Sequence, residues 1–218
     1  IKYIYQKNSG VSSARNKGIL NATYEWVAFL DSDDEWLESK LEKQVHLHKE
    51  NSDVLVSYTD ENWIREGVEV KIPKKFKKIG EDAFVENVSY CNIAPSSVLM
   101  RKSVFEDVGG FDEELEVCED YDLWLRVALK YKIVLVDEKL INKYAGHENQ
   151  LSFRHWGMDR FRVVTLEKLL SQKEKLSEID YKLLIEEIVK KYNLLLKGAI
   201  KYDRKKEIEI YKEKIAKF

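Results

Sequence analysis

Four short segments carry residues whose types and spacing could do chemistry, and the first is Asp31-Ser32-Asp33-Asp34. Its carboxylates repel one another unless a divalent cation or a positive ligand joins them. A polar loop in which Asp33 or Asp34 caps the next helix explains the segment equally well. A calcium loop of the EF-hand type is excluded, because Trp36 stands where that turn requires glycine.

The second segment begins at Gly109-Gly110-Phe111-Asp112 and continues through Cys118 to Trp124. Glu119, Asp120 and Asp122 place three carboxylates at the start of an expected helix, where the helix dipole favours negative charge. Capping is therefore one explanation. A general base is the other, since a neighbouring carboxylate raises the pKa of a carboxyl group toward neutral pH.

The two remaining segments are weaker signals when each is taken alone. Residues 8–18 (NSGVSSARNKG) form a glycine turn opening a helix, whose backbone N–H groups and Arg15 suit a phosphate or a base edge. Residues 144–150 (YAGHENQ) contain His147, which is a polar loop residue unless the fold brings it to the carboxylates as a metal ligand.

Hydrophobic periodicity predicts the elements that must position these segments. Strands are expected at residues 2–6, 25–30, 53–58, 97–101 and 133–137, and helices at 12–20, 81–87 and 119–130. A further helix is expected from Trp36, with Leu37, Leu41 and Val45 on its apolar face, while residues 65–80 read as a loop or hairpin. Alternating strands and helices predict an α/β sheet, and ligands bind such sheets at the carboxyl ends of the strands, where Asp31 lies.

The composition excludes several classes of protein. The 218 residues suffice for one α/β domain with a helical appendage, and the net charge of -2 argues against a nucleic-acid binder. Residues 171–218 hold 13 Lys and Arg against 9 Asp and Glu, a basic end that could contact a membrane surface. Apolar stripes at 181–199 and 208–218 could close the domain or form a homodimer. Two cysteines without paired spacing predict a reducing, cytoplasmic setting.

Taken together and in this order, the segments resemble family 2 glycosyltransferases of the GT-A fold. The matching stretches are NSGVSSARNKG, FLDSDDEW, the GGFDE to CEDYDLWLR block and YAGHENQLS, within residues 1–155. The resemblance implies a Rossmann-like mixed sheet flanked by helices, with the glycosyltransferase domain at 1–155 and a C-terminal helical extension at 156–218. In the family pattern a strand–helix–strand unit comes first. This chain is expected to lack that unit, to bind its donor weakly and to show weak or no transfer activity by itself.

The resemblance also implies roles for single residues. Asp31 and Asp33 match the DxD motif, in which Asp31 would meet the ribose or the metal and Asp33 would ligate Mn²⁺ or Mg²⁺. Glu119 and Asp120 match the ED motif, whose aspartate is the catalytic base. Arg15 and Asn16 would lie near the nucleotide, and His147 near the metal and the diphosphate.

The expected function is therefore metal-assisted inverting transfer of a sugar from a nucleotide-sugar, with UDP as the first choice of nucleotide. A saccharide or lipid-linked acceptor is expected, as in cell-surface polysaccharide synthesis at the inner face of the membrane. Trp36, Trp63 and Trp124 could stack on sugar rings, although core packing is the commoner role of tryptophan. Two alternatives remain: a nucleotidyltransferase on a similar sheet, and a truncated binding module without catalysis.

Overall fold

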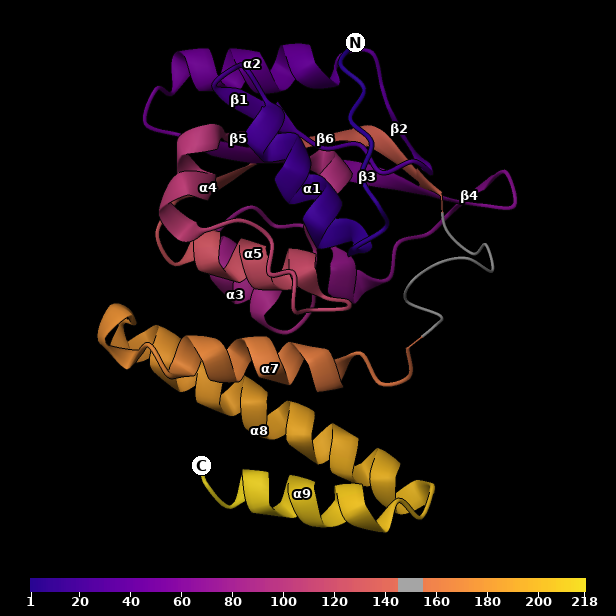
Figure 1. Ribbon diagram of the computed structural model, residues 1–218, viewed down its shortest axis with the longest axis vertical. Helices are drawn as coiled ribbons and strands as arrows, with labels where there is room; N and C mark the ends of the chain where they lie inside the picture. Colours follow the sequence, from indigo (N-terminus) through magenta and orange to yellow (C-terminus); the bar gives the residue numbers. More distant parts are fainter. Residues whose placement is uncertain (145–154) are drawn as a thin grey trace. The chain divides into compact units, whose positions relative to one another are not determined.

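The computed structural model describes residues 1–144 and 155–218. The chain forms two compact units, residues 1–150 and residues 151–218, and Figure 1 colours them along the sequence. The first unit contains α1 (Gly10–Asn21), β1 (Trp26–Ala28), β2 (Asp34–Trp36), α2 (Lys40–Glu50), β3 (Val56–Arg65), β4 (Val68–Val70), α3 (Ala83–Val88), β5 (Leu99–Arg101), α4 (Lys102–Val108), α5 (Glu119–Ala128) and β6 (Ile133–Tyr144), with short 3-10 turns at Lys74–Phe76 and Pro95–Ser97.

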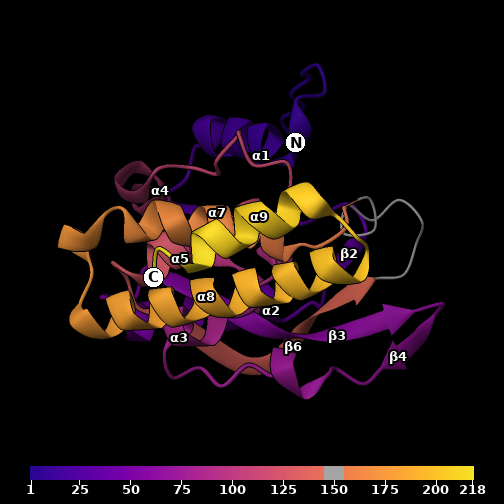
Figure 2. The same ribbon diagram turned by 90° about the horizontal axis from the view of Figure 1, so that it is seen from below.

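One mixed sheet organises this unit. Its strand order is β1-β5-β3-β6-β2, and β4 pairs with β3 as a hairpin. Only β3 and β6 run parallel, while the other described pairs are antiparallel. Figure 2 shows the long strands β3 and β6 side by side and the β3–β4 hairpin at the end of the sheet. This is the α/β mixed sheet with flanking helices that the family resemblance implies.

The hydrophobic core lies between the sheet and helices α1, α4 and α5. Val56 and Tyr58 of β3 pack in one cluster with Phe105, Leu123 and Trp124, all almost fully buried. The Trp124 indole N–H donates to the Ile93 carbonyl at 2.9 Å, which satisfies its polar atom inside the core. Trp124 is therefore a core residue, and the suggestion that it could stack on a sugar is wrong.

Helix α2 packs on the sheet with a polar face, contrary to the expected apolar stripe. Lys40, Gln44 and His48 are buried, whereas Leu41 and Val45 are each about two-fifths exposed. The cause is the sheet surface beneath the helix. The Gln44 amide donates to the Ser57 hydroxyl and to the Ser97 carbonyl, each at 3.1 Å, so the helix must supply polar partners there.

Two other sequence-based expectations are wrong. Residues 2–6 are in no strand, and Tyr3 and Tyr5 are exposed. Alternating apolar and polar residues do not form a strand by themselves, because a strand also needs a neighbouring strand for its backbone hydrogen bonds. The helix expected from Trp36 begins at Lys40, because residues 34–36 pair with β6 instead. It follows that neither Asp33 nor Asp34 is the N-cap of that helix, where Ser39 stands.

The second unit consists of three described helices, α7 (Asp159–Leu170), α8 (Glu178–Lys201) and α9 (Lys205–Ile215). Ser177 caps α8 by accepting from the Asp180 backbone N–H, and Leu184, Ile188 and Tyr192 form its buried stripe. Buried Lys191 pairs with Glu187 at 2.9 Å within the same helix. Among the helices that the structure describes, none is long and apolar enough to cross a membrane.

Candidate functional site

Arg15 joins two of the segments that the sequence singled out. Its Nη2 donates to the Asp31 Oδ1 and its Nη1 to the Glu119 Oε1, both at 2.7 Å. The guanidinium also lies 5.1 Å from the centre of the Phe111 ring, and the side chain is only 10% exposed. Arg15, in the second turn of α1, therefore joins the segment after β1 to the start of α5.

Glu119 and Asp120 occupy the first turn of α5. Cys118, the residue before the helix, adopts a left-handed backbone with φ 65°, which turns the chain into the helix. Burial raises the pKa of Glu119 to about 7, the Asp120 charge adds to this rise, and Arg15 opposes it. The Asp120 Oδ1 accepts from the Tyr121 backbone N–H at 2.7 Å. The two neighbouring carboxylates therefore differ in environment, because Glu119 is buried and Asp120 is half-buried.

Ser96 shapes the acidic segment. Its hydroxyl donates to the Asp34 Oδ2 at 2.6 Å and accepts from the Asp31 backbone N–H at 3.1 Å, and its carbonyl accepts from the Trp36 indole. Burial raises the pKa of Asp34 to about 6, although the Ser96 hydrogen bond opposes the rise. Asp33 is exposed between these fixed neighbours. The segment thus presents one accessible carboxylate at the edge of the sheet.

The donor chemistry of this segment suits a hard divalent cation. Asp31 and Asp33 supply carboxylate oxygens, which Mg²⁺ and Mn²⁺ prefer. Within the described residues, no group of three or more His, Cys, Asp or Glu side chains could hold a metal by itself. A Mg²⁺ ion bound through one or two carboxylates together with substrate phosphates needs no larger protein set. His147, the third predicted contact, lies outside the described residues.

Asn16 connects α1 to the segment before α5. Its amide nitrogen donates to the Phe111 carbonyl and its amide oxygen accepts from the Phe111 backbone N–H, both at 2.8 Å. A Cβ atom on Gly110 would lie 2.4 Å from the Asn16 amide oxygen, so only glycine permits this approach. Asn16 therefore orders the Gly109-Gly110-Phe111 turn behind Arg15, while its expected contact with a nucleotide stays a prediction.

Lys143 belongs to the site but was missed by the sequence reasoning. Burial disfavours its charge, yet Glu61, Asp34 and Asp120 together raise its pKa above the ordinary value. Its ammonium group therefore stays charged. No local signal identified it, because strand β6 was expected to end at Asp137 and extends to Tyr144.

Comparisons with known proteins identify the family of the chain. Residues 2–187 match the family model described as glycosyltransferase like family 2. The chain belongs to this glycosyltransferase family. An uncharacterized glycosyltransferase of Rickettsia conorii is 33% identical over 140 residues, which cover 64% of this chain and 23% of that protein.

Two further comparisons are informative. The Escherichia coli protein named UDP-Glc:alpha-D-GlcNAc-diphosphoundecaprenol beta-1,3-glucosyltransferase WfaP is 31% identical over 127 residues, covering 56% of this chain and 45% of that protein. The crystal structure of S. aureus TarS 1-349 in complex with UDP-GlcNAc aligns with a TM-score of 0.64 at 17% identity, covering 87% of this chain and 54% of that chain. The fold is therefore that of a known glycosyltransferase, and the chain spans about a quarter to a half of these relatives' lengths.

Proposed function

We propose that the protein transfers a sugar from a nucleotide-sugar, with UDP as the nucleotide, to a saccharide or lipid-linked acceptor. The observation that carries this proposal is the Arg15 bridge, which unites Asp31 of the DxD segment with Glu119 of the ED segment. Family membership supports the reaction class. The UDP-GlcNAc in the TarS complex and the UDP-Glc in the name of WfaP support a UDP-linked donor.

The donor diphosphate would lie at the segment after β1. Asp33 and Asp31 would hold a divalent cation there, and this cation would supply positive charge for the departing nucleoside diphosphate. Arg15 orients the Asp31 carboxylate and offers positive charge at the same place. The exposed position of Asp33 keeps its carboxylate accessible to a ligand from solvent.

Asp120 would act as the general base. Its charge raises the pKa of Arg15, of Glu119 and of Lys143, which supports a role for Asp120 among the charged groups of the site. As the acceptor hydroxyl attacks the anomeric carbon, its proton passes to the Asp120 carboxylate, and the bond between that carbon and the phosphate oxygen breaks. A single displacement of this kind inverts the configuration at the anomeric carbon.

Glu119 would be a positioning residue in this scheme. Its carboxylate contacts Arg15 at 2.7 Å, and its pKa of about 7 reflects burial. It holds the guanidinium against Asp31 and keeps the start of α5 beside the acidic segment. Asp120, the next residue, is then presented by the same helical turn.

Calorimetric titration tests the proposed donor site. UDP, GDP and dTDP are titrated into the protein with and without Mn²⁺, and the same series is repeated with a version extended upstream. Binding of UDP that requires Mn²⁺ is the expected result in the extended protein. Release of pyrophosphate instead of a nucleoside diphosphate during turnover would favour a nucleotidyltransferase, and absence of nucleotide binding in both versions would favour a binding module.

A further inference from the structure

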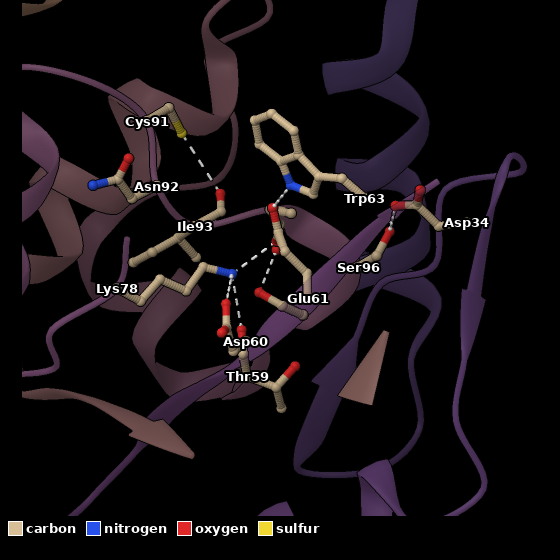
Figure 3. A network of polar contacts seen from close by, with 12 residues as sticks. Asp34, Thr59, Asp60, Glu61, Trp63, Lys78, Cys91, Asn92, Ile93 and Ser96 are labelled. Atoms are coloured by element: carbon tan, nitrogen blue, oxygen red, sulfur yellow. Dashed lines mark hydrogen bonds and ion pairs between the residues drawn. The ribbon is translucent and has the colours of Figure 1, made fainter. Parts of the chain in front are cut away.

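The acidic segment after β1 forms a four-residue turn, in which the Asp34 backbone N–H donates to the Asp31 carbonyl at 3.0 Å. One hydroxyl oxygen, that of Ser96, fastens both ends of this turn. It accepts from the Asp31 backbone N–H at 3.1 Å and donates to the Asp34 Oδ2 at 2.6 Å, the contact drawn in Figure 3. A hydroxyl group can do both, because it carries one donor and two acceptor positions. A single side chain therefore fixes the first and the last residue of the turn.

The carboxylates of Asp31 and Asp33 depend on the shape of this turn. Asp31 is held twice, at its backbone by Ser96 and at its Oδ1 by Arg15, whose Nη2 lies 2.7 Å away. Asp33 is exposed and lies between the two residues that Ser96 fastens. A cation bound by both carboxylates needs them at one separation, and a turn that is already ordered spares the conformational entropy of arranging them.

Ser96 is itself held firmly by its surroundings. It belongs to the short 3-10 turn Pro95–Ser97, and the proline ring at the start of this turn restricts the backbone. The Ser96 carbonyl accepts from the Trp36 indole at 2.8 Å, and the Ser97 carbonyl accepts from the Gln44 amide of α2 at 3.1 Å. The Ser96 side chain is fully buried. Its hydroxyl is therefore preorganised toward the acidic segment.

The neighbouring Ser97 shows what a purely local serine does in the same turn. Its side chain is equally buried, and its hydroxyl donates to the Ala94 carbonyl at 2.7 Å, three residues back in the chain. The Ser96 hydroxyl instead contacts residues that lie 62 and 65 positions away in the sequence. Ser97 therefore stabilises the turn that contains it, whereas Ser96 stabilises the acidic segment.

We propose that Ser96 is a positioning residue for the cation of the donor site. Its hydroxyl keeps the turn in the conformation in which Asp31 and Asp33 bind Mn²⁺ or Mg²⁺, and it acts through Asp31 and Asp34 without touching the cation. Loss of the hydroxyl leaves the Asp31 N–H and the Asp34 carboxylate without this partner, and the turn then relaxes. This inference rests on the proposed function, because it assigns a residue that supports the cation site of the same reaction.

The test measures Mn²⁺ affinity by electron paramagnetic resonance, in the upstream-extended protein with excess UDP. Ser96→Ala removes the hydroxyl that joins Asp31 and Asp34, and Ser97→Ala removes an equally buried hydroxyl that donates to the Ala94 carbonyl instead. We expect Ser96→Ala to weaken Mn²⁺ binding by about 10- to 100-fold, as is typical when a group that hydrogen-bonds a metal ligand is lost. Ser97→Ala should bind Mn²⁺ like the wild type.

Two further measurements separate positioning from a general loss of folded protein. Urea denaturation identifies which variants are folded under the conditions of the titration, and Ser96→Cys provides a second variant of similar size. Because a thiol is a weaker donor and acceptor than a hydroxyl, Ser96→Cys should lose less Mn²⁺ affinity than Ser96→Ala. Saturating Mn²⁺ should return the UDP affinity of Ser96→Ala to that of the wild type, since the variant keeps both carboxylates.

Several outcomes overturn the inference. These are a Mn²⁺ affinity of Ser96→Ala equal to that of the wild type, an equal loss in Ser97→Ala, or a UDP affinity that saturating Mn²⁺ does not restore. UDP binding by the wild type that is independent of Mn²⁺ also overturns it, while the proposed sugar transfer still stands.

The proposed function can fail separately. If the wild type binds no UDP, the proposed function is wrong, and titration of the same variants with Mn²⁺ alone then decides the inference. A weaker Mn²⁺ affinity in Ser96→Ala than in the wild type and Ser97→Ala supports it. A wild type that binds no Mn²⁺ in this titration overturns it.

Discussion

Replacing Arg15 by methionine should change the stability of the protein in a way that depends on pH. Methionine keeps the apolar stem, which packs near Phe111, and removes only the guanidinium that bridges Asp31 and Glu119. Glu119 is the more buried of the two carboxylates, with 9% of its side chain exposed against 33% for Asp31. Most of the lost free energy of unfolding should therefore come from Glu119.

The magnitude follows from the protonation state of Glu119. Breaking a buried ion pair costs about 3–5 kcal/mol. The loss is smaller here because Asp31 rehydrates and Glu119 can take up a proton. We therefore expect Arg15→Met to lower the free energy of unfolding by about 2–3 kcal/mol at pH 8. At pH 5, Glu119 is protonated, because its pKa is about 7. The guanidinium then donates to a neutral carboxyl group at Glu119 and forms an ion pair only with the partly exposed Asp31, so the loss falls to about 1 kcal/mol.

The direction of the pH dependence is fixed by linkage. Because the pKa of Glu119 is raised from 4.5 to about 7, the folded protein holds a proton that the unfolded chain releases, and stability falls as pH rises through this window. Without Arg15 the pKa of Glu119 rises further, so the fall continues to higher pH. Each additional pKa unit adds about 1.4 kcal/mol to the difference between variant and wild type.

Urea denaturation at pH 5, 6, 7 and 8 measures this effect. Lys130→Met provides the control, because it breaks an exposed ion pair with Asp107, whose pKa is lowered, and so should show the same effect at every pH in this range. A loss of stability in Arg15→Met that is equal at pH 5 and pH 8 would refute the reasoning, since it would mean that Glu119 does not depend on the guanidinium.

Three further predictions concern other parts of the first unit. Gly110→Ala should lower the free energy of unfolding by about 1–3 kcal/mol, because the added Cβ displaces the Asn16 amide oxygen and breaks its partly buried hydrogen bond with the Phe111 backbone N–H. Gly18→Ala in α1, with no atom within 4 Å of its Cβ, should be neutral or stabilising, and equal thermal stabilities for the two variants would contradict this account. Burial lowers the pKa of Lys40 to about 7, so the stability of the wild type should rise between pH 7 and 10.5, where only the unfolded chain holds the extra proton. Denaturation at pH 7 and pH 9 should show a smaller rise in Lys40→Met, and an unchanged slope would exclude Lys40 as its source. Asp33→Ala should remove the Mn²⁺-dependent part of UDP binding in calorimetry, and unchanged affinity would remove Asp33 from the site.

The elements that carry the motifs could be predicted from the sequence, because their local signals are strong. The glycine turn before α1, the apolar run of β1 and the acidic start of α5 each follow a recognisable rule, and the structure places them as expected. Hydrophobic periodicity predicted the wrong buried face for helix α2, because that face carries polar side chains. Helix α2 turns Gln44 toward the sheet, since polar groups there require partners.

The position of Lys143 was harder to predict because it depends on long-range register. Strand β6 was expected to end at Asp137, where Glu138 and Lys139 interrupt the apolar pattern, so Lys143 was not placed on the sheet. The register shift in β3 at Asp60 has no local sequence signal. The Arg15 bridge likewise joins residues 104 positions apart in the sequence, which only the fold brings together.

The most direct test of the central claim is sugar transfer by Asp120→Asn in the upstream-extended protein, measured together with UDP binding by the same variant. Asparagine keeps the size of the side chain and removes the group that accepts the proton. We predict that turnover falls by about 10²- to 10⁴-fold, while UDP affinity and the turnover of the control Asp107→Asn stay unchanged. Turnover of Asp120→Asn equal to that of the wild type would contradict the claim that Asp120 is the base of this transferase.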